Sequence, residues 1–223
     1  EELALYDLAA ATKLNSAEIA QGRVDDATWE RLITAAAKRS ARPLWVLGHS
    51  IERRKKRPRL TMTRIGEALH WIEDQMGFKP RAIFLDYLQL MQSESDAERR
   101  LQISENINRS KDMAIAMGCP VIMGVQAARE VDSRSWKLPQ LRDGQESSSV
   151  EQVADKMLSV WMPKTTEKIG ELLAETGRTV TENLLVMSVI KQKLGPAGEW
   201  WGLYVDPTRN EIAGMVKDGT DNR

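Results

Sequence analysis

The chain has 223 residues, enough to bury one substantial core with at most a small appendage. Lys plus Arg and Asp plus Glu both number 32, so the net charge is zero and a broadly basic nucleic-acid-binding protein is excluded. A single cysteine, Cys119, excludes an internal disulfide framework, and no apolar stretch approaches the length of a membrane span. We therefore expect a cytoplasmic protein without a membrane partner. The start, Glu-Glu-Leu-Ala, predicts a fragment or a processed product.

Helices and strands alternate along most of the chain. Capping residues and apolar stripes predict helices over 2–13, from Asn15 or Ser16, from Asp25 or Asp26, and over 63–76, 97–117 and 150–156. Apolar runs predict strands at 43–48, 81–86, 120–125, 157–162, 184–190 and 199–205. We expect an α/β fold with a mostly parallel sheet flanked by helices and antiparallel closing strands. One domain over 1–216 and a flexible tail over 217–223 complete the prediction.

The run Ala-Ile-Phe-Leu-Asp-Tyr-Leu-Gln-Leu-Met at 82–91 carries the most information. Four apolar residues without alternation predict a strand buried on both faces, and Asp86 ends that strand. A carboxylate is costly to bury unpaired, so we expect Asp86 at the carboxyl edge of the sheet, where it can hold a hydrated Mg²⁺ beside nucleotide phosphates. This is the pattern of a Walker B motif, although an ordinary strand-end Asp would read the same way.

Gln126 follows the next apolar strand, 120–125, at about one strand–helix–strand spacing from Asp86. Because the carboxyl ends of parallel strands meet at one edge, Gln126 is expected beside Asp86. A neutral amide there can orient water or contact a γ-phosphate. Taken alone, Gln126 would be a residue that closes a strand into a loop.

Three further segments carry charge in loops. Leu-Arg-Asp-Gly-Gln at 141–145, with Arg142, Asp143, Gly144 and Gln145, can grip successive phosphates of single-stranded DNA, or can be a solvated loop. Lys191 and Lys193 point the same way from an extended chain and can reach a neighbouring subunit's nucleotide, or form a solvated hairpin tip. The basic run 53–59 is either a phosphate-binding patch or a solvated loop.

Together these segments resemble the carboxyl-terminal RecA-like motor domain of DnaB-type replicative helicases over nearly the whole chain. The matching segments are 8–26 with its Gly-Arg-Val-Asp-Asp ending, 85–91, 100–104, 120–122 with Gln126 and Arg129, 141–142, 150–155, 191–193 and 195–196. The Asp-Tyr-Leu-Gln-Leu-Met run is more specific for this family than a generic Walker B motif would be.

The resemblance implies a RecA-like P-loop NTPase core, ATP and Mg²⁺ as cofactors, and a hexameric ring that translocates on single-stranded DNA. It implies that Asp86 is the metal carboxylate, through water, and that Gln126 senses the γ-phosphate. It also implies that Lys191 and Lys193 act in trans, and that Arg129 and the 142–145 loop contact DNA. A helicase loader and a primase are implied as partners.

The chain also departs from the family pattern. No Gly-x-x-x-x-Gly-Lys-[Ser/Thr] motif occurs in these residues; in the family it lies upstream of the segment that Glu1 begins, so we expect the chain alone to be inactive. Lys193 stands where the family commonly has an arginine, and Asp143 where it has Glu. Two alternatives to a helicase motor remain: a hydrolysis-deficient RecA-fold DNA-binding or replisome-assembly protein, and a recombination or repair ATPase.

Overall fold

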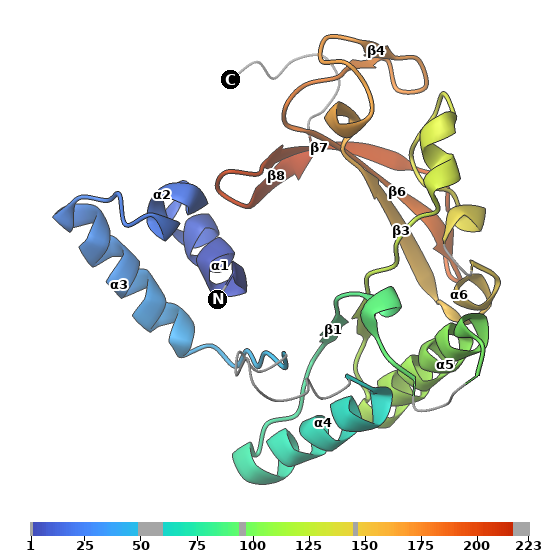
Figure 1. Ribbon diagram of the computed structural model, residues 1–223, viewed down its shortest axis with the longest axis horizontal. Helices are drawn as coiled ribbons and strands as arrows, with labels where there is room; N and C mark the ends of the chain where they lie inside the picture. The colour runs from blue at the N-terminus through green and yellow to red at the C-terminus, as the bar shows by residue number, and fades with distance from the viewer. Residues whose placement is uncertain (1, 49–59, 94–96, 145–146, 216–223) are drawn as a thin grey trace.

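The computed structural model describes residues 2–48, 60–93, 97–144 and 147–215 (Figure 1). The helices are α1 (Glu2–Thr12), α2 (Ser16–Ala20), α3 (Asp26–Ser40), α4 (Met62–Met76), α5 (Arg99–Met117) and α6 (Ser147–Val153). The strands are β1 (Ile83–Leu85), β2 (Val121–Met123), β3 (Lys156–Trp161), β4 (Leu172–Leu173), β5 (Arg178–Thr179), β6 (Leu184–Gln192), β7 (Trp200–Asp206) and β8 (Glu211–Met215). Four 3₁₀ turns lie between them: η1 (Leu88–Leu90), η2 (Arg129–Ser133), η3 (Leu141–Asp143) and η4 (Pro163–Thr165).

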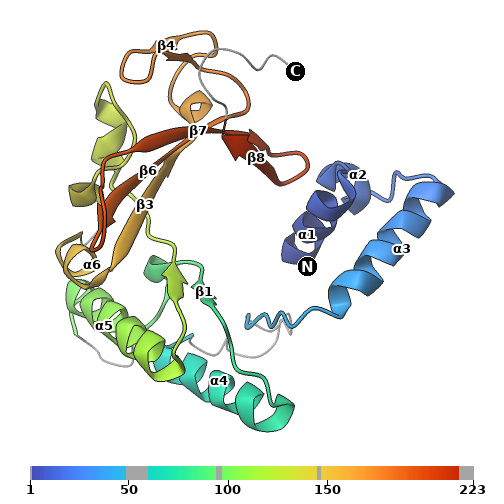
Figure 2. The ribbon, with the colours of Figure 1, turned by 180° about the vertical axis from the view of Figure 1, so that it is seen from behind.

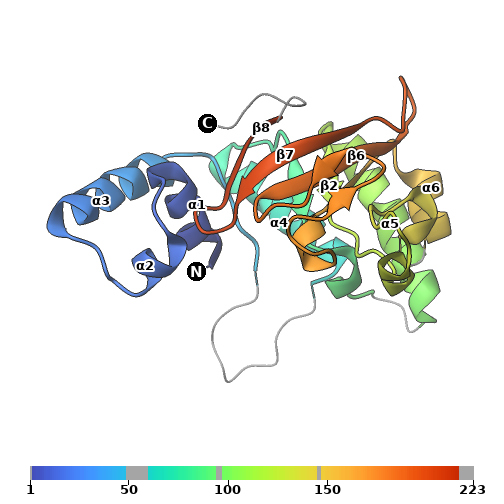
Figure 3. The same ribbon diagram turned by 90° about the horizontal axis from the view of Figure 1, so that it is seen from above.

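Helices α1 to α3 form a group of their own at the amino-terminal end, seen at one side of the molecule in Figures 1 and 2. The starts of α2 and α3 are set by the predicted caps: Asn15 accepts the Ala17 N–H at 2.8 Å, and Asp25 accepts the Thr28 N–H at 2.8 Å. This group meets the turn between β7 and β8, where the Ser16 N–H donates to the Thr208 carbonyl at 2.8 Å (Figure 3).

Strands β1 and β2 pair in parallel, with Leu85 opposite Met123. Ile83 and Leu85 are buried against a cluster that includes Met62 and Ile65 of α4, Met117 of α5 and Cys119 just after α5. Phe84, on the other face of β1, is 71% exposed in this chain. The prediction of burial on both faces was therefore wrong for the described residues, because α4 and α5 cover only one face.

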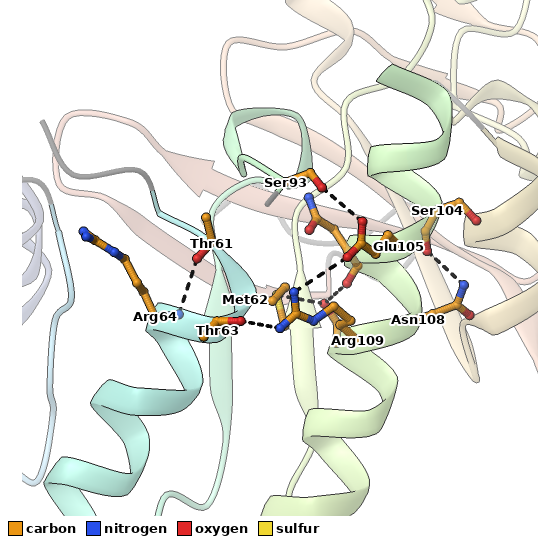
Figure 4. Close-up of polar contacts among 11 residues, drawn as sticks. Thr61, Met62, Thr63, Arg64, Ser93, Ser104, Glu105, Asn108 and Arg109 are labelled. Carbon is orange, nitrogen blue, oxygen red and sulfur yellow. Dashed lines mark hydrogen bonds and ion pairs between the residues drawn. The ribbon is translucent and has the colours of Figure 1, made fainter. Parts of the chain in front are cut away.

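The seam between α4 and α5 is partly polar (Figure 4). The Arg109 guanidinium donates to the Thr63 hydroxyl at 2.5 Å, and Ser93 Oγ lies 3.0 Å from a carboxylate oxygen of Glu105. Beneath them the buried hydroxyl of Ser110 donates to the carbonyl of Asn106 at 2.7 Å. Of these contacts, the bond between Arg109 and Thr63 joins α5 to α4, and the contact between Ser93 and Glu105 joins α5 to the segment after η1.

The larger sheet is antiparallel, in the order β3-β6-β7-β8, and β4 and β5 form a separate hairpin. Its core consists of Leu138, Trp161, Leu173, Val180, Leu184 and Val186. The α/β class and the antiparallel closing hairpin β6–β7 were predicted correctly. The parallel part, however, is smaller than expected, since β1–β2 is the parallel pair among the strands described.

One further expectation differs from the structure. Residues 43–48 form no strand and remain exposed, with Leu44 at 70%, because they have no pairing partner among the residues described. Trp136 packs beside the core of the antiparallel sheet, with 5.2 Å between its ring centroid and that of Trp161. The basic run 53–59 and the tail 217–223 lie outside the described residues. None of the helices in the described ranges combines the length and apolarity needed to cross a membrane.

Candidate functional site

Asp86 and Gln126 follow the carboxyl ends of the adjacent parallel strands β1 and β2, as the sequence predicted. The backbone links the two ends, because the Gly124 N–H donates to the Leu85 carbonyl at 3.0 Å and the Leu88 N–H to the Gly124 carbonyl at 2.9 Å. A Cβ on Gly124 would lie 3.7 Å from an Asp86 carboxylate oxygen, so that carboxylate sits directly over the end of β2.

Gln89 ties the segment after Asp86 to the segment after β2. Its side-chain oxygen accepts the backbone N–H of Gln126 at 3.2 Å, while Arg99 donates to the Gln89 carbonyl at 2.5 Å. Leu88, one residue earlier, is fully buried between Ile103 and Val150. The backbone at Gln126 is thus held by a core-anchored turn, while the Gln126 side chain itself is exposed.

Asp86 fits a magnesium ion held mainly through water. The side chain is exposed and forms no hydrogen bond or ion pair with the part of the chain that the structure describes. No group of three His, Cys, Asp or Glu side chains that could enclose a metal occurs in that part either. Mg²⁺ keeps several waters and commonly takes one or two carboxylates together with substrate phosphates, which agrees with a single free carboxylate.

The predicted DNA loop is clamped onto the segment that follows Gln126. Ala127 and Gly144 form an isolated antiparallel bridge, and the Ala128 N–H donates to the Asp143 carbonyl at 2.7 Å. Arg129 and Arg142 are both exposed on this joined pair of segments. Gln145 lies outside the described residues. The structure therefore joins the segment that carries Gln126 and Arg129 to the segment that carries Arg142 through backbone hydrogen bonds.

Asp143 has a different place from the one expected of a DNA contact. Its carboxylate is buried, forms an ion pair with Arg134, and accepts the Gln140 N–H at 2.7 Å. Burial raises the pKa of this carboxyl, but the hydrogen bonds from Arg134 and Gln140 and the charges of Arg134 and Arg142 outweigh it, so the pKa is lowered. Asp143 supports the loop from beneath while Arg142 faces outward.

Lys191 and Lys193, at the end of β6 and just beyond it, contact other residues than Asp86 and Gln126. The Lys191 ammonium donates to the Glu151 carbonyl near the end of α6, and the Lys193 ammonium lies 2.5 Å from a carboxylate oxygen of Asp155. No hydrogen bond or ion pair joins either lysine to Asp86 or Gln126 in the described parts of the chain. Among the residues described in one chain, Lys191 and Lys193 therefore contact α6 and the segment after it, and not the Asp86 and Gln126 site.

Sequence reasoning missed the residues that hold these sites in shape. Gln89, Arg134 and Asp155 act through partners 37, 9 and 38 positions away in the sequence. Nothing in local spacing indicates such pairs, since each depends on how distant segments pack. Gln89 offered one signal, a polar side chain within an apolar run.

Comparison with known proteins identifies the family of the chain. The sequence model of the DnaB-like helicase C terminal domain family matches residues 1–207. The chain is 31% identical over 168 residues to replicative DNA helicase DnaB of Mycobacterium intracellulare, covering 75% of this chain and 27% of the relative. It is 33% identical over 162 residues to the replicative DNA helicase DnaB of Helicobacter pylori strain ATCC 700392 / 26695, covering 72% of this chain and 31% of that relative. The chain thus spans about a quarter to a third of these curated relatives.

Two solved structures share the fold. One is an ATPase domain that superposes with a TM-score of 0.80 at 22% identity, covering 96% of this chain and 70% of that one. The other is a DnaB-like replicative helicase described with its interactions with primase. It superposes with a TM-score of 0.78 at 22% identity, covering 95% of this chain and 47% of that one. These likenesses establish the RecA-like α/β fold. The family match over residues 1–207 shows that this chain belongs to the DnaB-like helicase C-terminal domain family.

Proposed function

We propose that these residues are part of an ATP-driven motor that translocates on single-stranded DNA as a hexameric ring of replicative-helicase type. The observation that supports the proposal is the position of Asp86 and Gln126 just beyond the carboxyl ends of two paired parallel strands, in a chain of this family. An exposed carboxylate beside a backbone-anchored amide is an arrangement suited to Mg²⁺ and a γ-phosphate.

Each residue then has a role that its placement supports. Asp86 holds the magnesium ion through water, and Gln126 orients water or contacts the γ-phosphate. When bound, ATP would supply the phosphoryl group that is transferred to water, and Mg²⁺ would neutralise charge on the phosphate oxygens. Lys191 and Lys193 add positive charge at the nucleotide of the adjacent subunit, since within the chain they contact neither Asp86 nor Gln126 in the described ranges.

DNA binding falls to the exposed guanidinium groups of Arg129 and Arg142, whose loop Asp143 supports, together with Gly144 and Gln145. The clamp between Ala127 and Gly144 connects this loop with the segment that carries Gln126. A change at the nucleotide can therefore reach the DNA loop through a short, hydrogen-bonded path. A helicase loader and a primase are the partners that we propose for such a motor.

The test is Asp86→Asn in the full protein encoded by the native gene, with Asp74→Asn on the exposed face of α4 as the matched control. We expect DNA-stimulated ATP hydrolysis to fall by about a hundredfold, because the amide no longer carries the charge that attracts the hydrated metal. The control should retain activity, and both variants should unfold at the wild-type temperature.

Unwinding of a forked DNA substrate by the same proteins separates the alternatives. Hydrolysis and unwinding that both depend on Asp86 support the motor. Near-normal hydrolysis by Asp86→Asn contradicts the metal assignment. DNA binding without hydrolysis in the wild-type protein would instead indicate a RecA-fold assembly protein, and strand exchange without unwinding would indicate a recombination or repair ATPase.

A further inference from the structure

Asp155, which lies between α6 and β3, is shared by two lysines from different elements. One carboxylate oxygen lies 2.5 Å from the Lys193 ammonium, and the other forms an ion pair with Lys111 of α5. The Lys193 backbone N–H also donates to the Asp155 carbonyl at 3.1 Å. Lys193 is therefore held to the same residue by its main chain and by its side chain.

The support beneath this cluster is anchored in the core. Val150 of α6 is buried against Ile103 and Ile107 of α5, and Val153 and Met157 pack against the same cluster. The Lys191 ammonium donates to the Glu151 carbonyl on this helix. Both lysines near the end of β6 are thus fastened to one short segment, 151–155, whose position α5 determines.

The charges of the cluster do not cancel. Hydrogen bonds from Lys111 and then from Lys193 lower the pKa of Asp155 to about 2, so the carboxylate is ionised throughout the neutral range. Two ammonium groups then share one carboxylate, and the cluster keeps one net positive charge. Because Lys111 already balances the carboxylate, the charge of Lys193 remains available to an external phosphate.

We propose that Asp155 is a positioning residue: it fixes the Lys193 ammonium where it can meet a nucleotide phosphate of the adjacent subunit, with Lys111 as its counter-charge. The inference rests on the proposed function, in which Lys193 acts in trans. A lysine side chain has a flexible four-carbon stem and binds as a point charge without the rigid fork of arginine. If Asp155 already holds the Lys193 side chain in place, less side-chain conformational entropy is lost when the ammonium binds the phosphate.

The experiment compares Asp155→Asn, Asp155→Glu and Lys193→Ala in the full protein, with the exposed Asp112→Asn of α5 as the control. We expect Asp155→Asn to lower kcat for DNA-stimulated ATP hydrolysis about tenfold, while KM for ATP changes by less than about twofold. Asp155→Glu keeps the charge and should restore part of kcat. The control and the unfolding temperatures should not change.

Mixed oligomers identify which side of the subunit interface is affected. Asp155→Asn subunits mixed with Asp86→Asn subunits should regain part of the turnover, because some interfaces then combine an intact Asp86 with an intact Lys193. Asp155→Asn mixed with Lys193→Ala should regain none, since both changes damage the same side.

Different failures have different meanings. Normal turnover of Asp155→Asn beside an impaired Lys193→Ala would overturn the positioning role and leave the trans assignment standing. Recovery in the mixture of Asp155→Asn with Lys193→Ala would also overturn it, because the two residues would then act separately. Normal turnover of Lys193→Ala would contradict the trans role in the proposed function, and the positioning role with it.

Discussion

The carboxylate of Asp143 is buried, and the conformation of the proposed DNA loop depends on the contacts that this carboxylate makes. Its ion pair with Arg134 and its bond from the Gln140 N–H close the η3 turn that presents Arg142. Removing one partner of a buried charged pair leaves the other without compensation. The loop therefore depends on Asp143 although the carboxylate itself does not face a ligand.

Asp143→Asn is expected to lower the free energy of unfolding by about 2 kcal/mol at pH 7, because Arg134 loses its charged partner. The pKa of Asp143 is lowered in the folded protein, so its stabilisation is complete above the ordinary value of 3.8 and is lost as the pH falls through the folded value. The difference between variant and wild type should therefore shrink below about pH 4.

Denaturant unfolding at pH 7 and at pH 3 measures both parts of this expectation. The exposed Asp132→Asn in η2 serves as the control and should change stability little at either pH. A difference between Asp143→Asn and wild type that is the same at both pH values would contradict the role of the ionised pair.

At the scale of elements, the close approach of β2 to the Asp86 turn depends on a glycine. A Cβ at Gly124 would come within 3.2 Å of the Tyr87 Cβ, 3.7 Å of an Asp86 carboxylate oxygen and 3.8 Å of the Leu85 carbonyl. The first of these distances is tighter than ordinary packing, so the Tyr87 segment has to shift by a few tenths of an ångström. That shift acts directly next to the proposed metal carboxylate.

Gly124→Ala should therefore reduce Mg²⁺-dependent ATP hydrolysis about tenfold, since small displacements of a reacting geometry are costly. Gly66→Ala is the contrasting change, because Gly66 lies inside α4 and its Cβ would meet nothing within 4 Å. It should raise the free energy of unfolding by about 0.5–1 kcal/mol and leave turnover unchanged. Thermal unfolding measures the stability of both variants, and steady-state kinetics measure their ATP turnover. Wild-type turnover of Gly124→Ala would show that the turn at Asp86 tolerates the shift.

The elements show where sequence reasoning succeeds. Local chemistry set the helix starts, and Asn15 and Asp25 cap them as predicted. The strand at 43–48 was wrong, because apolar composition indicates a strand only if a partner strand lies beside it. Strand β8 was missed, since the polar start of Glu211–Met215 lacks an apolar run and its pairing with β7 provides the missing signal.

In the candidate site too, features set by strand order were predicted, whereas features set by contacts between distant segments were not. Asp86 and Gln126 were predicted to meet because parallel strand order alone brings their ends together, and β1 and β2 pair as expected. Burial of Asp143 and the sharing of Asp155 by two lysines depend on contacts between distant segments. Such contacts are set by tertiary packing, which spacing along one sequence does not contain.

At the scale of the whole molecule, a net charge of zero means that DNA binding has to come from a few placed cations. Arg142 is exposed on a turn that a buried ion pair and a backbone bridge hold in place. Each cation that binds a phosphate releases counterions from the DNA, so affinity depends on salt in proportion to the number of phosphates that the protein neutralises.

Arg142→Ala in the full protein is expected to weaken single-strand binding and to reduce the slope of log K against log salt by about 0.7 for each phosphate that is no longer neutralised. Arg64→Ala is the matched control, because Arg64 is exposed on α4 and its side chain points away from α5 in Figure 4. Fluorescence anisotropy with labelled oligonucleotides of different sequence at several salt concentrations measures both the affinity and the slope. A loss of affinity that is uniform across sequences indicates a phosphate contact, whereas an unchanged slope would place the DNA-binding surface away from the η3 loop.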